Sequence, residues 1–400
     1  MSDAELEILK SEEVQTFIAQ NENEDVHKLL LKHKTLFGLP FGIIADQVIG
    51  RQKISCKSPF LYDSKGIIYP PSLNLEQSSS EATALFKTKI FSAVLNKKHI
   101  ADLTGGFGID SLVFSREVSQ IEFIEPNKDL LEIVKHNFKL LRIDNVHSHF
   151  SSAEEFLSKS KRRVDLIYLD PSRRDSSKKK VFRLEECSPN ISEIKDLIFE
   201  CADLMLIKTS PLLDISQALK EIPFVKRIAI VSVDNECKEV LFFSEKKFHG
   251  EPRISAYNLM KGESQEFELL AQEEVNAICE FSEPLDFLYE PNSSILKAGA
   301  FKLIGKKFGL KKIHPNTHLY TSTFLLKSFP GRIFKIEKRE PDFKKDLLEK
   351  KANVITRNFP LKPEELSKKL KLQDGGEKYI VAFSGAKQKY IVLASKVEYS

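Results

Sequence analysis

The spacing of apolar and polar positions changes twice along this 400-residue chain. In residues 1–38, apolar side chains recur every three or four positions, which predicts helices. From residue 99 to about residue 247, short apolar runs alternate with amphipathic segments, which predicts strands that alternate with helices. Beyond residue 247 this alternation stops, and short strand-like segments follow. We therefore expect a helical beginning, an α/β middle and a differently built C-terminal part.

Five apolar runs predict the strands of the α/β middle, and a closing pair of strands follows them. The five runs are residues 99–104, 121–125, 145–152, 164–170 and 204–210, and the closing pair is 227–233 and 239–245. The segments between the runs are amphipathic, as in residues 126–143, where one helical face is apolar. This alternation predicts a doubly wound α/β sheet with a mostly parallel core.

The flanking segments carry loop and hairpin signals. Residues 40–75 are rich in Pro and Gly and predict loops, whereas residues 76–96 predict a loop and then a helix capped by Ser79 or Ser80. Near the C-terminus, two alternating segments flank Gly385 and predict a hairpin. Residues 331–400 contain 17 Lys or Arg against 10 Asp or Glu, which indicates a small basic α+β unit.

Composition narrows the class of protein. Hydrophobic residues make up 42% of the chain and charged residues 30%, values typical of a globular protein. No apolar run approaches about 18 residues, and the N-terminus lacks a basic start with an apolar stretch, so we expect neither a membrane span nor a signal peptide. The cysteines form no CxxC pair and the histidines have no ligand spacing. We therefore expect a reduced, cytoplasmic protein without a metal site.

Positive charge is concentrated in two stretches, although the net charge is only +4. Residues 291–336 contain no Asp or Glu, and residues 159–183 contain a second cluster. Such clusters attract the polyphosphate backbone of a nucleic acid. The alternative interpretation of each cluster is an ordinary solvated surface without a bound partner. Two stretches, one of them beside a candidate active site, favour a nucleic acid. The basic residues are Lys297, Lys302, Lys306, Lys307, Lys311, Lys312, Lys327, Arg332 and Lys335, and then Lys159, Lys161, Arg162, Arg163, Arg173, Arg174, Lys178, Lys179, Lys180 and Arg183.

A glycine-rich turn follows the first strand of the α/β middle. Asp102 precedes Gly105, Gly106 and Gly108, and Glu125 ends the second strand. Glycines let the backbone approach a ligand closely, and a carboxylate at the end of the second strand can accept hydrogen bonds from ribose hydroxyls. A dinucleotide site is the alternative, but its glycine spacing differs. An acidic residue ahead of the glycines also suits the cationic amino-acid tail of S-adenosylmethionine better than a pyrophosphate.

The third and fourth strands add groups to the same edge of the sheet. Ser152 and Ala153 follow the third strand, where an adenine edge would lie, and Asp170 and Pro171 end the fourth. The carboxyl ends of parallel strands meet at one edge, so we expect these groups to share one crevice with the glycine turn.

These segments resemble the motifs of class I S-adenosylmethionine-dependent methyltransferases, which have a Rossmann-like sheet. Residues 102–110 resemble motif I, Glu125 resembles the acidic residue of motif II, and residues 170–175 resemble motif IV. The resemblance implies that S-adenosylmethionine is the cofactor. The expected cofactor contacts are Asp102, Thr104, Gly105, Gly106, Gly108, Asp110, Glu125, Pro126, Ser152 and Ala153. Glu81 is a further candidate, together with Gln77, as part of a lid over the cofactor; a serine-capped helix start is the alternative.

The whole chain also resembles a bacterial group of RNA methyltransferases. The segments that carry this resemblance are residues 76–87, 206–215, 288–301, 314–322 and 372–383. It implies RNA as the partner and a fixed domain order. That order is an N-terminal helical region at 1–95, the methyltransferase domain at 96–248, a ferredoxin-like domain at 249–328 and a THUMP-like domain at 329–400.

The candidate catalytic residues are Asp170, Pro171 and Arg173. In relatives that methylate exocyclic amines, this motif holds the amine and stacks the base on an aromatic side chain. Here Ser172 replaces the second proline and Arg173 replaces the aromatic residue, which argues against simple exocyclic-amine chemistry. Arg173 and its neighbour Arg174 either hold a base or a phosphate, or extend the basic surface.

A pyrimidine C5 mechanism would need a cysteine nucleophile, but Cys187 and Cys201 are interpreted as core residues.

Three hypotheses for the function remain open. The leading hypothesis is a methyltransferase of a tRNA or rRNA base, with folded RNA held by the basic C-terminal modules. The alternatives are a methyltransferase of a protein or small molecule, and a non-catalytic RNA-binding protein.

Overall fold

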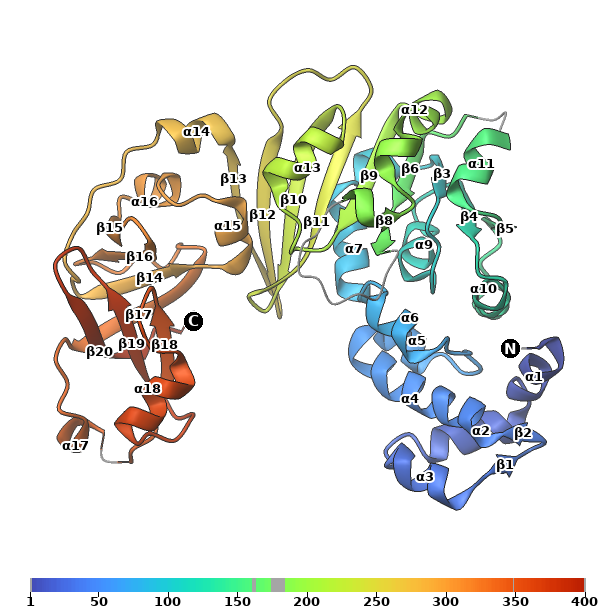
Figure 1. The fold of residues 1–400 in the computed structure, drawn as a ribbon, viewed down its shortest axis with the longest axis horizontal. Coiled ribbons are helices and arrows are strands. Elements are labelled where there is room, and N and C mark those ends of the chain that lie inside the picture. Colours follow the sequence, from blue (N-terminus) through green and yellow to red (C-terminus); the bar gives the residue numbers. More distant parts are fainter. Residues whose placement is uncertain (1, 160–162, 174–183, 348, 399–400) are drawn as a thin grey trace. The chain divides into compact units, whose positions relative to one another are not determined.

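The computed structural model of the chain describes residues 2–159, 163–173, 184–347 and 349–398, and it contains two compact units (Figure 1). The first unit comprises Met1–Val225 and Phe242–His249, and the second comprises Lys226–Leu241 and Gly250–Ser400. Within the described ranges, none of the helices is both long enough and apolar enough to cross a membrane.

The first 95 residues are mainly helical and include one two-stranded ladder; the prediction of loops at residues 40–75 is wrong for Phe41–Lys57, which forms the 17-residue helix α4. The prediction for residues 1–38 is confirmed for three helices, the last of which ends at Lys32; Phe37 and Gly38 then take positive φ and turn the chain between two short strands. The predicted cap is confirmed at Ser80, whose Oγ accepts from the Thr83 amide at 3.2 Å. The elements are α1 (Asp3–Leu9), α2 (Glu12–Gln20), α3 (Val26–Lys32), β1 (Thr35–Leu36), β2 (Leu39–Pro40), α4 (Phe41–Lys57), α5 (Pro59–Asp63), α6 (Ser72–Gln77), α7 (Glu81–Ile90) and α8 (Ser92–Leu95).

The rest of the first unit is built on a parallel sheet with the strand order β9-β6-β3-β4-β5. The five predicted strands are all present, and every residue of β6 is buried, as its continuous apolar run predicts. The elements are β3 (His99–Asp102), α9 (Ile109–Phe114), β4 (Gln120–Glu125), α10 (Lys128–Leu140), β5 (Val146–Phe150), α11 (Ala153–Lys159), β6 (Leu166–Leu169), β7 (Ser172–Arg173), η1 (Leu184–Glu186), β8 (Cys187–Ser188), α12 (Ile191–Cys201), β9 (Leu204–Thr209) and α13 (Ile215–Glu221).

The second unit contains two sets of paired strands. β12 pairs parallel with β10 and antiparallel with β13. A seven-stranded sheet follows, with the order β15-β16-β14-β17-β20-β19-β18, and it includes the hairpin predicted around Gly385. β14 pairs with both β16 and β17. The boundary expected at residue 329 between the ferredoxin-like and THUMP-like domains therefore falls within one sheet.

The predicted closing strands, β10 and β11, lie where the two units divide. The elements from β10 onward are β10 (Val225–Val233), β11 (Glu236–Glu245), β12 (Arg253–Met260), β13 (Glu263–Leu270), α14 (Ala271–Asn276), β14 (Phe287–Pro291), α15 (Ser293–Ala298), α16 (Leu303–Phe308), β15 (Lys311–His314), β16 (Thr317–Ser322), β17 (Gly331–Lys338), α17 (Phe343–Asp346), β18 (Asn353–Arg357), α18 (Pro363–Leu370), β19 (Lys378–Ser384) and β20 (Lys389–Lys396).

Candidate active site

A cavity of about 310 Å³ lies at the carboxyl ends of the strands of the first unit. The predicted residues that line it are Asp102, Thr104, Gly105, Gly106, Gly108, Asp110, Glu125, Pro126, Ser152, Ala153 and Asp170. Gln77, Ser79 and Ser172, which were named from the sequence for other reasons, also line the cavity, and the lining residues that were not expected include Asn74, Ser78, Asn127, Tyr168, Ser188 and Pro189. The four strand ends therefore meet in one crevice, as a parallel sheet requires.

The glycine turn lies directly against β4. A Cβ atom added to Gly105 would stand 2.3 Å from the Phe123 ring, and the Gly105 amide donates to the Ile124 carbonyl at 2.9 Å. Gly106 and Gly108 have positive φ, of 57° and 80°. The turn therefore needs glycine for two separate reasons, close packing beneath it and left-handed backbone within it.

Glu125 is buried at the end of β4 and is fixed by backbone amides. Its Oε2 accepts from the Gly106 amide at 2.9 Å, and its Oε1 accepts from the Asn127 amide at 2.8 Å. Burial raises the pKa of Glu125, although both of these hydrogen bonds act to lower it. Each carboxylate oxygen keeps a further lone pair for a ligand.

Asp102 is only 1% exposed at the end of β3. Its carboxylate accepts from the Thr104 amide at 3.1 Å and from the Ser111 hydroxyl at 2.6 Å. Burial raises the pKa of Asp102 to about 7; these hydrogen bonds oppose that rise, and the charges of Asp110 and Asp170 add to it. Around neutral pH, the ionised and protonated forms of Asp102 are therefore close in free energy, and the carboxyl group can lose its proton to solvent when a cationic ligand binds.

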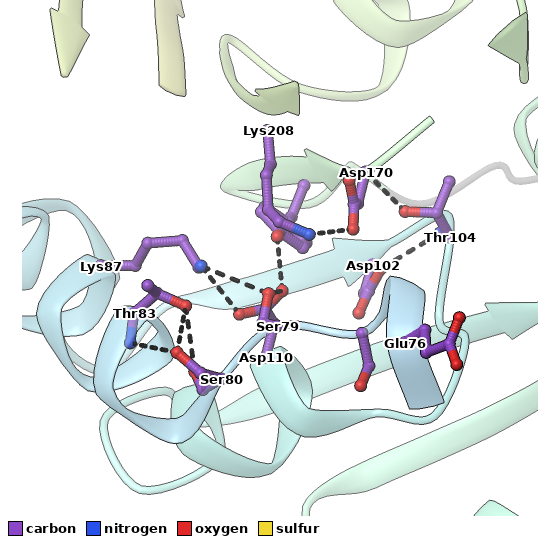
Figure 2. A network of polar contacts seen from close by, with 12 residues as sticks. Glu76, Ser79, Ser80, Thr83, Lys87, Asp102, Thr104, Asp110, Asp170 and Lys208 are labelled. Carbon is purple, nitrogen blue, oxygen red and sulfur yellow. Dashed lines mark hydrogen bonds and ion pairs between the residues drawn. The ribbon is translucent and has the colours of Figure 1, made fainter. Parts of the chain in front are cut away.

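Asp110, at the start of α9, is the centre of a buried polar network (Figure 2). Its Oδ2 accepts from the Ser79 hydroxyl at 2.6 Å and from the Tyr168 hydroxyl at 2.7 Å, and its Oδ1 lies 3.1 Å from Lys87 Nζ. Burial alone would raise the pKa of Asp110, but the charges of Lys87 and Lys208 and the two hydroxyl donors lower it below its usual value. Asp110 is therefore held as a carboxylate.

Asp170 follows β6 and joins the network to the wall of the cavity. Its amide donates to Thr104 Oγ1 at 2.6 Å, and its Oδ2 is ion-paired with Nζ of Lys208 on the adjacent strand β9 (Figure 2). The side chain of Asp170 is 31% exposed, whereas that of Lys208 is 10% exposed. Asp170 therefore lines the cavity with a paired carboxylate.

Some candidates lie elsewhere. Glu81 does not line the cavity; its Oε2 accepts from the Ser58 hydroxyl at 2.9 Å and the Phe60 amide at 3.0 Å, at the start of α5. Pro171 is absent from the cavity lining, although Ser172 belongs to it. The side chain of Arg173 lies outside the described part of the chain, as do Lys161, Arg162, Arg174, Lys178, Lys179, Lys180 and Arg183.

The two cysteines considered as nucleophiles differ in burial. Cys201 is buried as predicted, and burial raises the pKa of its thiol. The prediction of a buried Cys187 is wrong, because this residue is half-buried in β8, where it pairs with Arg173 of β7. A short edge ladder shields a side chain less than the core helix that the sequence suggested.

The polar residues behind the cavity were missed by sequence reasoning. Lys87, on α7, is fully buried, and Lys208 lies within the otherwise apolar strand β9. For Lys208, a single charge directly after the apolar run Leu204–Ile207 was the available signal, because burying an unpaired charge is costly and such a residue needs a partner.

The acid-free stretch at 291–336 does not form a uniformly free basic surface. Lys302, Lys307 and Lys312 donate to backbone carbonyls at 2.7–2.8 Å. Lys311 pairs with Glu280 at 3.2 Å, and Arg332 pairs with buried Glu290. Lys306, Lys327 and Lys335 are exposed.

Family models match three parts of the chain. Residues 82–212 match the family described as Conserved hypothetical protein 95. Residues 287–330 match a ferredoxin-like domain, and residues 331–396 match a model described as THUMP domain-like.

Similar proteins carry methyltransferase names. A solved structure from Porphyromonas gingivalis W83, described as a "putative methyltransferase", is 29% identical and has a TM-score of 0.84, with 98% of both chains covered. The Escherichia coli protein yhhF, described in the same words, is 16% identical with a TM-score of 0.32, covering 42% of this chain and 87% of its own. An "uncharacterized RNA methyltransferase" of Protochlamydia amoebophila (strain UWE25) is 31% identical over 115 residues, or 28% of this chain.

The chain spans about a quarter of that last relative, since the match covers 26% of its length. The resemblance seen in the sequence is confirmed by the family models and by the full-length structural match. The chain therefore has the fold of a solved structure described as a putative methyltransferase, and parts of its second unit match a ferredoxin-like and a THUMP-like model.

Proposed function

We propose that this protein is an S-adenosylmethionine-dependent methyltransferase that acts on RNA. One observation carries the cofactor proposal: Asp102 and Glu125 are buried in one cavity on adjacent strands, and burial raises the pKa of both. A cationic ligand relieves the cost of ionising them, whereas a pyrophosphate would add negative charge.

The residues present fit this cofactor. Asp102 would face the ammonium group, and Glu125 would accept from the ribose hydroxyls through its remaining lone pairs. The glycine turn allows the backbone to approach, because added side chains there would meet Phe123 or strain the backbone. Ser152 and Ala153 would lie near the adenine, and Thr104, Asp110 and Pro126 would complete the wall. The bound cofactor would supply an electrophilic methyl group, and Asp170 would orient the acceptor.

Cofactor binding is tested by calorimetry with S-adenosylhomocysteine and the variants Asp102→Asn and Glu125→Gln. Each variant removes a charge-assisted hydrogen bond, so we expect affinity to fall by about tenfold or more. The matched control is Glu132→Gln, which alters a half-buried carboxylate on α10 that does not line the cavity. Unchanged affinity in both site variants, or no binding by the wild type, would refute the proposal.

The RNA proposal has three supports. The partial relative is named as an RNA methyltransferase, a THUMP-like model matches residues 331–396, and exposed lysines remain in the acid-free stretch. The test is transfer of tritiated methyl groups to total RNA from a strain that lacks the gene, with Asp170→Ala as the inactive comparison. Label should enter RNA only with the wild-type protein.

A protein or small-molecule acceptor is the second candidate. It is favoured by the internal partners of Lys302, Lys307 and Lys312, which leave less free charge for RNA than the sequence suggests. The discriminating variant is Lys306→Gln with Lys327→Gln and Lys335→Gln, because deleting residues 330–400 would remove strands from the seven-stranded sheet. For an RNA enzyme, we expect this variant to bind RNA more weakly, with a salt dependence reduced by up to about one per lysine. Unchanged RNA methylation and salt dependence would favour the second candidate.

A further inference from the structure

The ion pair between Lys208 and Asp170 sets the net charge that a methyl acceptor meets at this wall of the cavity. Asp170 lines the cavity, whereas Lys208 does not; its ammonium group reaches Asp170 Oδ2 from the neighbouring strand (Figure 2). Lys87 balances Asp110 in the same way, at 3.1 Å. The carboxylate at the acceptor position is therefore half of a nearly neutral pair and not an isolated negative charge.

We propose that Lys208 is a positioning residue for Asp170, and that the acceptor is a nucleotide group with an acidic proton, a hydroxyl or a ring imide N–H. This inference rests on the proposed function. It deepens that function, because it excludes the exocyclic amines of the bases as acceptors.

The two kinds of acceptor develop charges of opposite sign during methyl transfer. An exocyclic amine becomes cationic as it takes the methyl group, so it is best stabilised by an unpaired carboxylate. A hydroxyl or an imide N–H develops negative charge as its proton leaves, so a nearby ammonium group stabilises it. The Asp170–Lys208 pair offers a proton acceptor together with a cation, which suits the second kind of acceptor.

The surrounding motif agrees with this assignment. The residues that follow Asp170 in the sequence are Pro171, Ser172 and Arg173, so none of the three is an aromatic residue on which a base could stack. In the transfer itself, the acceptor atom bonds to the methyl carbon while the carbon–sulfur bond breaks and leaves its electron pair on sulfur. The acceptor proton passes to the Asp170 carboxylate and then to water.

Lys208→Met and Lys208→Arg test the role of Lys208, with Lys98→Met as the control. Lys98 pairs with Asp165 at 3.5 Å, and neither residue lines the cavity. We expect Lys208→Met to lower the methyl-transfer rate roughly 10²-fold while affinity for S-adenosylhomocysteine changes less than about threefold. Lys208→Arg should recover most of the rate, because it restores the cation. A wild-type rate in Lys208→Met, or no recovery in Lys208→Arg when both variants melt like the wild type, would overturn the assignment.

The identity of the product tests the acceptor class with the wild-type protein, so it does not depend on how any variant folds. Labelled RNA is digested to nucleosides, and the methylated nucleoside is separated by chromatography. We expect label in a 2′-O-methyl nucleoside or in a nucleoside methylated at an imide nitrogen, which is N1 of guanine or N3 of uracil. Label on an exocyclic amine, on a ring nitrogen that carries no proton or on a carbon atom overturns this inference alone. No label in RNA, despite binding of S-adenosylhomocysteine, refutes the RNA proposal and this inference with it.

Discussion

The two units bury lysine side chains in different ways. In the first unit, buried Lys87 and Lys208 face the carboxylates of Asp110 and Asp170. In the second unit, Lys312 is equally buried, at 2% exposure, but its ammonium group donates to the carbonyl of Pro315 at 2.8 Å. The first arrangement joins charges of opposite sign, and the second joins a charge to a neutral dipole.

In the first unit, each buried lysine and its carboxylate partner depend on one another, whereas the charge of Lys312 in the second unit could be removed without leaving an opposite charge unpaired. If a buried ion pair loses one member, the other is left uncompensated in a medium of low dielectric constant. A carbonyl that loses its donor recovers a water molecule when it is exposed, as Pro315 is. The comparison therefore predicts large effects at the cavity and small ones in the acid-free stretch.

The largest effect is expected for Lys87→Met. This change leaves Asp110 buried without its closest cation, and breaking a buried pair in this way costs about 3–5 kcal/mol in the free energy of unfolding. Urea denaturation of the wild type and the variant measures the difference. The Asp110→Asn change, added to Lys87→Met, should recover part of the loss because it removes the uncompensated charge. A loss below about 1 kcal/mol would show that Lys208 and the two hydroxyl donors suffice for Asp110.

A smaller, pH-dependent effect is expected at Asp102. Burial raises the pKa of Asp102 to about 7, whereas the ordinary pKa of an Asp, which applies in the unfolded chain, is 3.8. Between these values the folded state binds more protons than the unfolded state, so this residue makes stability fall as pH rises from about 4 to about 7. Asp102→Asn should remove the part of this fall in stability that the ionisation of Asp102 causes. Stability of both proteins is measured by urea denaturation between pH 4 and pH 7.5.

The same carboxylate gives the pH dependence of ligand binding the opposite sign. A cationic ligand favours the ionised form, so affinity for S-adenosylhomocysteine, which keeps the ammonium group, should rise as pH increases from 5.5 toward about 7 and should be accompanied by proton release. Calorimetry in two buffers with different ionisation enthalpies measures that release. Equal pH dependence in wild type and Asp102→Asn would assign the titration to another group.

The part of the site that sequence predicted is the part fixed by strand ends. Asp102, the glycine turn, Glu125 and Asp170 each follow a strand of a parallel sheet, and such strand ends meet at one edge whatever the helices do. Local pattern was therefore sufficient to bring them together. The strand order of the seven-stranded sheet in the second unit was not predictable in this way. Strand β14 pairs antiparallel with β17, although β15, β16 and two helices separate these strands in the sequence, so no regular alternation of strands and helices indicates the pairing.

The part that was missed depends on which face of a helix packs inward. Sequence reasoning chose Glu81 on α7, but the same helix buries Lys87 against Asp110. Six residues of helix rotate a side chain by about 600°, so these two point in different directions. The choice between them was made by tertiary packing. Counting lysines at 291–336 failed for a related reason, since a count does not reveal which ammonium groups reach carbonyls.

The smallest effect, and the sharpest test of the comparison, is expected for Lys312→Met. Methionine fills a similar volume without a charge to desolvate, so we expect stability at pH 7 to change by less than about 1 kcal/mol, toward the stable side. Burial lowers the pKa of Lys312, although the charges of Cys279 and Glu274 oppose that shift. Below an unfolded-state pKa near 10.5, the unfolded wild type therefore binds more protons than the folded one, and wild-type stability gains from this residue as pH rises. The advantage of the methionine variant should accordingly shrink between pH 8 and pH 10, as followed by urea denaturation. A loss as large as that of Lys87→Met would mean that the carbonyl partner matters as much as a carboxylate, and the contrast between the two units would fail.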